Sequence, residues 1–410
     1  MANEWRPTTV GEFCPFSYGK ALPERARIPG EFPVISSAGI SGSHNEPLVT
    51  KAGIVIGRKG TVGSVTLSKT AFWPIDTTFY IADEPQRDLR FTYYLLKALG
   101  LDRMNSDSAV PGLNRDYAHA RAIAVPELTE QRAIAHIIGT LDDKIELNRR
   151  QNETLEAMAR ALFKAWFVDF APVRAKMEGR WQRGQTLPGL PAHLYDLFPD
   201  RLVESELGEI PEGWEMRSLD SIANYLNGLA LQKFPPESET EFLPVIKIAQ
   251  LRAGNTNGAD KASTQIKPEY VVVDGDVLFS WSGSLEVEVW NGGRGALNQH
   301  LFKVTSNEVP KWFYFFATRQ HLPDFRAIAA GKATTMGHIQ RKHLTDARIA
   351  VAPPESMKKF DAVIASQFDQ LVSNAQQSRS LAQLRDTLLP KLISGELRVP
   401  DAERIVGAAV

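Results

Sequence analysis

Apolar residues recur at alternating steps of four and three in two long segments of the chain. Such steps average 3.5 residues, which is the period of a helix that packs along one seam against a second helix. The first seam comprises Ile134, Ile138, Leu141, Ile145, Asn148, Asn152, Leu155, Ala159, Leu162 and Trp166. The second comprises Phe360, Ile364, Gln367, Leu371, Asn374, Ser378, Leu381, Arg385, Leu388 and Leu392. The pattern therefore predicts two long helices that bury their seams against each other.

Both seams are interrupted by polar residues at the same steps. Asn148 and Asn152 break the first seam, and Asn374 and Ser378 break the second at an offset of 226 residues. Matching breaks in two helices indicate an internal duplication. We expect the helices to run antiparallel with Asn148 facing Asn374, because a buried asparagine pair fixes the register of a coiled coil. The alternative is that these positions face solvent or another subunit.

The duplication extends upstream of both helices. Trp5 and Trp214 mark similar segments at the start of each half. Three further pairs of segments align at offsets of 226, 223 and 222 residues: Gly112–Pro126 with His338–Ala352, Gly53–Thr61 with Asp276–Ser284, and Asp76–Ile81 with Asn298–Lys303. The drifting offset indicates insertions, which loops tolerate. The order is therefore globular unit, long helix, globular unit, long helix.

Strand and helix patterns are mixed within each globular unit. The runs GIVIG, GSVTL and TTFYIA predict strands in the first unit, as do VVVDGDVLFS and HLFKV in the second. LRFTYYLLKALG and KWFYFFATRQ predict helices. We therefore predict an α+β fold with two similar α/β domains, related by a pseudo-two-fold axis and joined by a long antiparallel two-helix coiled coil. The boundaries are 1–126 for the first domain, 127–170 for the first helical region, 171–212 for an ordered but irregular connector, 213–352 for the second domain, 353–400 for the second helical region and 401–410 for a C-terminal tail.

The composition is that of an ordinary globular protein, with 43% hydrophobic and 23% charged residues. Cys14 is the only cysteine, which excludes an intrachain disulfide and a cysteine-rich zinc site. The first residues lack the apolar region of a secretory signal, and no apolar run is long enough to span a bilayer, so we expect a cytoplasmic protein. Because the net charge is only −1, a nucleic-acid partner must be argued from local clusters.

A rod between two similar domains suits a ligand with two separated sites. The span from Ile134 to Trp166 is roughly 48 Å at 1.5 Å per residue, and DNA offers half-sites about 34–36 Å apart per helical turn. Basic residues without acidic neighbours occur between residues 47 and 75 and between residues 325 and 345. Beside the Gly, Ser, Thr, Asn and Gln of these stretches, such cations can contact phosphates and base edges.

The loops that correspond between the two halves supply the candidates for DNA binding. These candidates are Arg58, Lys59, Thr61, Asn114, Arg115, Trp281, Ser282, Ser284, Lys332, Thr334, Thr335, His338, Gln340 and Arg341. Asn114 and Gln340 coincide at an offset of 226, and either recognition of adenine or bracing of the loop is compatible with them. Trp281 can stack on a sugar or an extruded base, or it can belong to the core. The pair Arg58–Lys59 can also be a solvated turn.

Three segments resemble one protein family. The sequence LTEQRAIAHIIGTLDDKIELNRRQNETLEAMARALFKAWFVDF (Leu128–Phe170) resembles the first conserved region of type I restriction-modification specificity subunits. SELGEIPEGWE (Ser205–Glu215) and LRDTLLPKLISGEL (Leu384–Leu397) are similar to the start of that family's second recognition domain and to its closing segment. The resemblance covers nearly the whole chain in the same order, although it is only architectural within the recognition domains.

The resemblance implies a non-catalytic DNA-recognition subunit in which each recognition domain reads one half of a bipartite target in double-stranded DNA. It also implies that the helical regions dock two methyltransferase subunits, which use S-adenosylmethionine to methylate adenine. Restriction subunits, which translocate and cleave DNA with ATP and Mg, are the further partners. No cofactor is expected in this chain itself. Apolar residues beyond the seam, namely Phe163, Phe167 and Phe170, are candidates for the docking surface, or they pack within the end of the coil.

No catalytic motif stands out in the sequence. The closest string to the Asp/Asn-Pro-Pro-aromatic motif of amino-methyltransferases is APPE (Ala352–Glu355), which lacks both the polar first residue and the aromatic. There is no GxxxxGK[ST] phosphate loop and no histidine or cysteine spacing for a metal. Two alternatives remain: a self-sufficient DNA enzyme whose active site is not evident, and an interaction scaffold that carries two binding modules and does not contact DNA.

Overall fold

The computed structural model describes residues 5–104, 112–206, 208–331 and 337–407 of the chain. Two compact units are present, and each is described by itself. Unit 1 contains Met1–Glu146 and Ser380–Val410, and unit 2 contains Leu147–Arg379. Each unit therefore combines one globular domain with part of each long helix.

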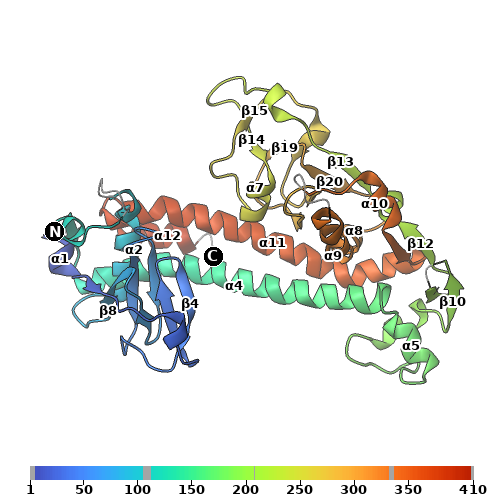
Figure 1. Cartoon of the computed structure of the whole chain (residues 1–410), viewed down its shortest axis with the longest axis horizontal. Helices are drawn as coiled ribbons and strands as arrows, with labels where there is room; N and C mark the ends of the chain where they lie inside the picture. Colours follow the sequence, from blue (N-terminus) through green and yellow to red (C-terminus); the bar gives the residue numbers. More distant parts are fainter. Residues whose placement is uncertain (1–4, 105–111, 207, 332–336, 408–410) are drawn as a thin grey trace. The chain divides into compact units, whose positions relative to one another are not determined.

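The two predicted long helices are α4 (Leu128–Phe167) and α11 (Pro354–Ile393), with 40 residues each (Figure 1). In unit 1 the early part of α4 packs against the late part of α11, through the buried residues Ile134, Ile138, Leu141, Leu381, Leu388 and Leu392. In unit 2 the late part of α4 packs with the early part of α11 in one core. The predicted antiparallel pairing of the two helices is therefore confirmed.

The polar residues of the seam meet inside unit 2. Asn148 is 1% exposed and Asn374 is 4% exposed, so the alternative that they face solvent is wrong. Asn148 Nδ2 donates to Gln377 Oε1 at 2.8 Å and to the Asn374 carbonyl at 3.4 Å. Asn374 Nδ2 donates to Asn152 Oδ1 at 3.0 Å. The two buried asparagines thus lie together, although they bond through neighbours and backbone rather than side chain to side chain.

The globular domain of unit 1 is built on a four-stranded antiparallel sheet (Figure 1). Its order is β2 (Ser17–Tyr18), β8 (Thr78–Ala82), β5 (Gly53–Gly57) and β6 (Val65–Ser68). A second sheet has the order β4 (Gly39–His44), β3 (Phe32–Ser36) and β7 (Trp73–Pro74), and β1 (Arg6–Thr9) pairs with β9 (Ala122–Val125). Ile54 and Ile56 of β5 join the core of α4, whereas Val55 packs with Phe72. Alternate residues of β5 are therefore buried on opposite faces, as its unbroken apolar run requires.

The globular domain of unit 2 repeats this arrangement. Its main sheet has the order β13 (Asn224–Asn227), β20 (Leu301–Thr305), β17 (Val277–Ser280) and β18 (Val287–Val289), again antiparallel. A second sheet has the order β15 (Lys261–Ala262), β14 (Leu243–Ile246), β19 (Gly295–Leu297) and β16 (Val271–Val272), and β12 (Glu215–Ser218) pairs with β21 (Arg348–Val351). The strands predicted in both halves are present at the expected places, which confirms the duplicated α+β fold.

Shorter helices complete both units. In unit 1 these are α1 (Val10–Phe13), α2 (Leu89–Ala98), α3 (Arg115–His119), α12 (Val399–Gly407), η1 (Glu24–Ala26) and η2 (Leu101–Arg103). In unit 2 they are α5 (Ala171–Met177), α6 (Leu219–Ile222), α7 (Ile248–Ala253), α8 (Lys311–Gln320), α9 (Leu322–Ala330), α10 (Arg341–Asp346), η3 (Ala192–Leu197), η4 (Leu231–Lys233) and η5 (Pro268–Tyr270). Helices α2 and α8 occupy the stretches predicted to be helical.

The connector is more regular than its composition indicated. It contains α5, η3 and the hairpin of β10 (Leu202–Ser205) with β11 (Gly208–Pro211). Trp181 and Phe198 anchor it, because both side chains are buried in the core of unit 2. Their rings pack edge to face with centroids 6.1 Å apart. The connector is therefore part of the folded unit.

The three phenylalanines proposed for subunit docking lie in the core of unit 2. Phe163, Phe167 and Phe170 are 2%, 1% and 8% exposed. Phe167 packs edge to face on Phe313 at 5.0 Å, and Phe170 packs on Trp214 at 6.1 Å. The expectation that they are exposed and available to a partner is therefore wrong, because the domain's own aromatic residues cover this end of α4.

Candidate nucleic-acid interface

The main sheet of each unit brings one aromatic ring next to one residue of its edge strand. Phe79 of β8 pairs with Tyr18 of β2 in unit 1. Phe302 of β20 pairs with Asn227 of β13 in unit 2. Because the strand order is the same in both sheets, Tyr18 and Asn227 occupy equivalent positions.

A glycine follows each of these edge residues because the backbone of another segment lies against it. A Cβ atom on Gly19 would lie 2.0 Å from the carbonyl oxygen of Ile75, and one on Gly228 would lie 2.2 Å from that of Asn298. Real Cβ atoms do not approach oxygen so closely, so only glycine fits. Each glycine N–H also donates to the sheet at 3.0 Å. This close approach fixes where the preceding side chain leaves the edge strand.

The residue that follows the central strand is equivalent in the two units as well. Arg58 follows β5 and Trp281 follows β17. The N–H of Leu113 donates to the Arg58 carbonyl at 2.9 Å, and the N–H of Ile339 donates to the Trp281 carbonyl at 3.0 Å. These bonds join each strand end to the loop that leads into α3 or α10. The offset of 226 residues between the two loops is therefore a structural correspondence.

Helices α3 and α10 begin with Arg115 and Arg341. Before α3, Asn114 Oδ1 accepts the N–H of Tyr117 at 3.0 Å, which is the bond of a helix N-cap. Asn114 therefore braces its loop, one of the two roles that the sequence left open. Gln340 precedes α10 with an exposed side chain. It remains a candidate for contact with a ligand.

The candidate residues of unit 1 gather around Tyr18. This side chain is 51% exposed. The guanidinium carbons of Arg58 and Arg115 lie 5.1 Å and 5.0 Å from the centre of its ring, within the range of cation–π attraction. Arg58 also lies 5.9 Å from the ring of Phe79. Two cations are thus held beside one exposed aromatic side chain, while Lys59 and Thr61 are exposed in the following turn.

The equivalent residues of unit 2 gather around Phe302. Trp281 Nε1 donates to Asn227 Oδ1 at 2.9 Å, and the Trp281 ring lies 5.9 Å from that of Phe302. The guanidinium carbon of Arg341 lies 5.7 Å from the Phe302 ring. Arg341 Nη2 donates to the Tyr225 carbonyl at 2.9 Å. Trp281 is half-buried, so it combines partial packing with an accessible surface.

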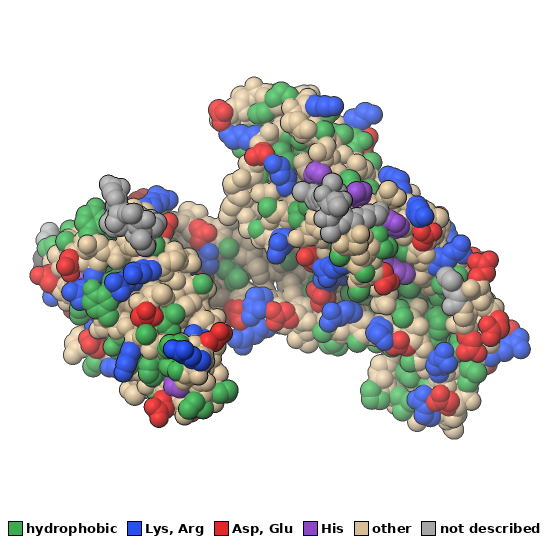
Figure 2. Space-filling model, in the orientation of Figure 1, with side chains coloured by type: hydrophobic (Ala, Val, Ile, Leu, Met, Phe, Trp, Pro, Cys, Tyr) green, Lys and Arg blue, Asp and Glu red, His purple; other side chains and the backbone are tan. Residues whose placement is uncertain are grey.

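The remaining candidates of unit 2 differ in their accessibility. Ser282 is 3% exposed and its hydroxyl lies 2.9 Å from His300 Nδ1, so it supports the cluster from within. Ser284 is exposed, and the ring of half-buried His338 lies 6.2 Å from that of Trp281. Figure 2 shows several histidines on the face of unit 2 that it displays. Lys332, Thr334 and Thr335 lie outside the described residues.

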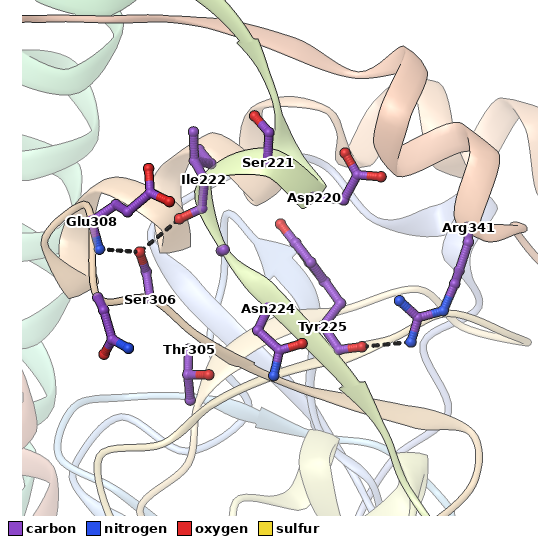
Figure 3. Close-up of a pocket in the computed structure, with 11 residues that line it drawn as sticks. Asp220, Ser221, Ile222, Asn224, Tyr225, Thr305, Ser306, Glu308 and Arg341 are labelled. Carbon is purple, nitrogen blue, oxygen red and sulfur yellow. Dashed lines mark hydrogen bonds between the residues drawn. The ribbon is translucent and has the colours of Figure 1, made fainter.

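A hollow beside Arg341 is not suited to a phosphate. It is lined by the edge strand β13 and by Asp220, Asn224, Ser306 and Glu308 (Figure 3). Figure 3 shows Arg341 reaching from α10 to the backbone carbonyl of Tyr225. The carboxylates of Asp220 and Glu308 repel anions from the hollow itself. An anionic ligand of Arg341 must therefore approach from outside it.

The described residues contain no group of three or more His, Cys, Asp or Glu that could hold a metal ion. Cys14 is buried, and burial raises the pKa of its thiol to about 12, so it is unreactive at neutral pH. Among the described helices, none has the length and apolar character needed to cross a bilayer. Arg326, which belongs to the basic stretch of the second half, donates through Nε and Nη2 to the Leu285 carbonyl and is bound within the domain.

Sequence reasoning missed four residues of the two clusters: Tyr18, Phe79, Asn227 and Phe302. The two-residue strand β2 is too short to show a period, and pairing between distant strands leaves no local signal. The useful signal was the glycine after each edge residue, at Gly19 and Gly228.

Comparison with known proteins agrees with this architecture. The family model described as the type I restriction modification DNA specificity domain matches residues 2–157 and 211–384. The chain is 25% identical over 366 residues to the specificity subunit of the type I restriction enzyme MjaIX from Methanocaldococcus jannaschii, covering 86% of this chain and 79% of the relative. It is also 25% identical over 331 residues to the HindI specificity subunit from Haemophilus influenzae, covering 70% of this chain and 71% of the relative.

A solved structure of similar fold is the S subunit of a type I restriction-modification system from M. genitalium. It superposes with a TM-score of 0.58 at 15% identity, covering 96% of this chain and 97% of the other. The two matched stretches of the family model correspond to the two halves of the duplication. The chain therefore belongs to the family of type I restriction-modification DNA specificity domains.

Proposed function

We propose that this chain is the DNA-recognition subunit of a type I restriction-modification complex and that each unit reads one half of a bipartite target. The observation that carries this proposal is the recurrence of one arrangement in both units. In each, an arginine at a helix start lies over an aromatic ring of the main sheet, at Arg115 beside Tyr18 and at Arg341 beside Phe302. Arginines held in this way can contact phosphates and base edges of DNA.

Two similar sites on one chain fit a target with two separated halves better than a target read continuously. The clusters share their backbone frame but differ in side chains, since Arg58 in unit 1 corresponds to Trp281 in unit 2. Different side chains present different donors and apolar surfaces to base edges. The two halves of the target are therefore expected to have different sequences. The paired helices α4 and α11 serve as the spacer that sets the number of base pairs between them.

The chemistry belongs to partner subunits in this proposal. A duplicated chain offers two equivalent surfaces and can hold two identical methyltransferase subunits. Those subunits bind S-adenosylmethionine and supply the methyl group. Restriction subunits that use ATP and Mg join the complex in the cytoplasm. Since Phe163, Phe167 and Phe170 are buried, the docking surface for these partners must use other residues.

The test is sequencing of methylated DNA from cells that express the chain together with the methyltransferase subunits of its own system. The expected result is one methylated motif made of two short specified halves separated by unspecified base pairs. Absence of a modified motif, or a single continuous motif, would contradict the proposal. An interaction scaffold would give no motif and no salt-dependent binding of the complex to DNA.

A further inference from the structure

Four equivalent positions surround the end of the main sheet in each unit. Two of them are chemically the same, because Phe79 corresponds to Phe302 and Arg115 corresponds to Arg341. We name these shared residues the frame. The other two positions differ, since Tyr18 and Arg58 stand in unit 1 where Asn227 and Trp281 stand in unit 2. We name each of these differing pairs the variable pair of its unit.

The two members of each variable pair contact each other. In unit 1, Arg58 lies over the ring of Tyr18, with its guanidinium carbon 5.1 Å from the ring centre. In unit 2, Trp281 Nε1 donates to Asn227 Oδ1 at 2.9 Å. A cation on an aromatic ring in one unit is thus replaced by an indole bonded to an amide in the other. Both members of the pair differ together, while the frame around them is retained.

This division separates contacts that any DNA sequence can satisfy from contacts that select bases. Phosphates are the same at every step of a duplex, so a residue that contacts them can be the same in both units. Base edges differ between two half-targets, so the residues that contact them must differ. The frame arginines have the first property and the variable pairs have the second.

We infer that the variable pair Tyr18–Arg58 selects a base of the half-target read by unit 1, with Arg58 contacting a guanine, and that Asn227–Trp281 selects a different base in the other half. This inference rests on the proposed function. The frame arginines Arg115 and Arg341 bind phosphates on both sides.

The geometry of Arg58 suits a guanine contact. Guanine presents O6 and N7 as two adjacent acceptors in the major groove, which match the fork of a guanidinium group. Arg58 makes one long bond from Nη1 to the Asp76 carbonyl, at 3.5 Å, so most of its five N–H donors remain available. The ring of Tyr18 holds the guanidinium group in place. A fork held in advance loses less freedom when it binds.

The variable pair of unit 2 offers a different set of groups. The Asn227 side-chain oxygen accepts from Trp281, which leaves its NH₂ group to donate to a base. Asn227 is exposed, and the Trp281 ring presents an apolar surface beside it. A single amide donor cannot reproduce the two-pronged contact that an arginine makes with guanine. The base selected at this position of the second half-target is therefore recognised by other contacts.

The experiment measures how strongly the assembled complex of this chain with its methyltransferase subunits binds its target and every single-base-pair variant of that target. The variants of the chain are Arg58→Lys, Asn227→Ala and Arg115→Lys, with Arg404→Ala as the control. Arg404 is 80% exposed on α12 and pairs only with the nearby Asp401. Arg58→Lys keeps the charge needed for a phosphate contact but loses the fork.

Arg58→Lys is expected to reduce discrimination at one G·C pair of one half-target by about 10- to 100-fold, with the other half unchanged. Asn227→Ala is expected to relax one base pair in the other half only. Arg115→Lys and Arg404→Ala are expected to leave all preferences unchanged. The inference is overturned if Arg58→Lys keeps the full pattern of preferences, relaxes both halves, or abolishes binding to every sequence. Failure of the proposed function is distinct, because the unaltered complex would then show no bipartite preference at all.

Discussion

Replacing Asn374 by alanine tests whether the polar layer of the long helices stabilises unit 2. Its Oδ1 accepts from Gln370 Nε2 at 2.7 Å, and its Nδ2 donates to Asn152 Oδ1 at 3.0 Å. A third contact, to Gln151 Oε1 at 3.5 Å, is at the limit of a hydrogen bond. Each lost bond costs about 0.5–1.5 kcal/mol net. Because Gln370 and Gln151 are exposed and can bond to water instead, we expect a loss of about 2 kcal/mol.

An aspartate at the same position separates the bonds from the packing. Asn374→Asp can still accept from Gln370, but it cannot donate to Asn152 when it is ionised. It also places a charge where the native side chain is 4% exposed. Burying an unpaired charge costs more than losing a neutral hydrogen bond. The aspartate variant should therefore be less stable than the alanine variant at neutral pH and should recover part of the loss on acidification.

The assay is hydrogen–deuterium exchange of the amides in the middle of α11, since local opening reports stability where a chain of two units does not unfold in one step. Gln376→Ala is the matched control, because Gln376 is exposed two residues further along the same helix. Its effect should stay within about 0.5 kcal/mol. If Asn374→Ala changes protection no more than this control, or if the aspartate variant is the more stable of the two, the reasoning is refuted.

Three further predictions concern the core, the interface and pH. Phe163→Ala should destabilise unit 2 by about 3–5 kcal/mol in urea unfolding, because the ring is 2% exposed, whereas the exposed Arg160→Ala should have little effect; equal effects would contradict the assignment of Phe163 to the core. Arg341→Ala should weaken binding of the complex to all DNA sequences and reduce the slope of log affinity against log salt by about 1; an unchanged slope would remove Arg341 from the interface. Burial lowers the pKa of His119, whose Nε2 accepts the Phe16 N–H at 2.9 Å. As the pH falls below about 6.5, the unfolded chain therefore takes up the proton first and stability declines until the pH passes the folded pKa; His119→Leu should show a smaller decline in melting temperature between pH 7 and pH 5, and an equal decline would exclude His119 as its source.

The parts of the fold that the sequence revealed are those with a local period. The seams of α4 and α11 were predictable because the apolar steps repeat along each helix, and the buried pair of Asn148 and Asn374 was predictable because both break that repeat. The strands of both sheets were predictable from short apolar runs. Comparison of the two halves then showed which loops correspond. All of these signals lie within a few residues of the elements they predict.

What the sequence did not reveal depends on contacts between distant segments. Tyr18 belongs to the interface only because β2 pairs with β8, and a strand of two residues has no pattern of its own. Phe163 and Phe167 are apolar on a helix, and the sequence alone does not say whether their own domain or a partner covers them. Asn114 illustrates a third case, because cap and base contact require the same residue type. Geometry separates these alternatives.

The central claim is that the two clusters contact separate halves of one DNA site, and the most direct measurement is hydroxyl-radical footprinting of the assembled complex on its target. The account predicts two protected stretches separated by accessible base pairs. It also predicts that Arg115→Ala weakens protection of one stretch and that Arg341→Ala weakens protection of the other. A single uninterrupted footprint, or equal weakening of both stretches by each variant, would contradict it.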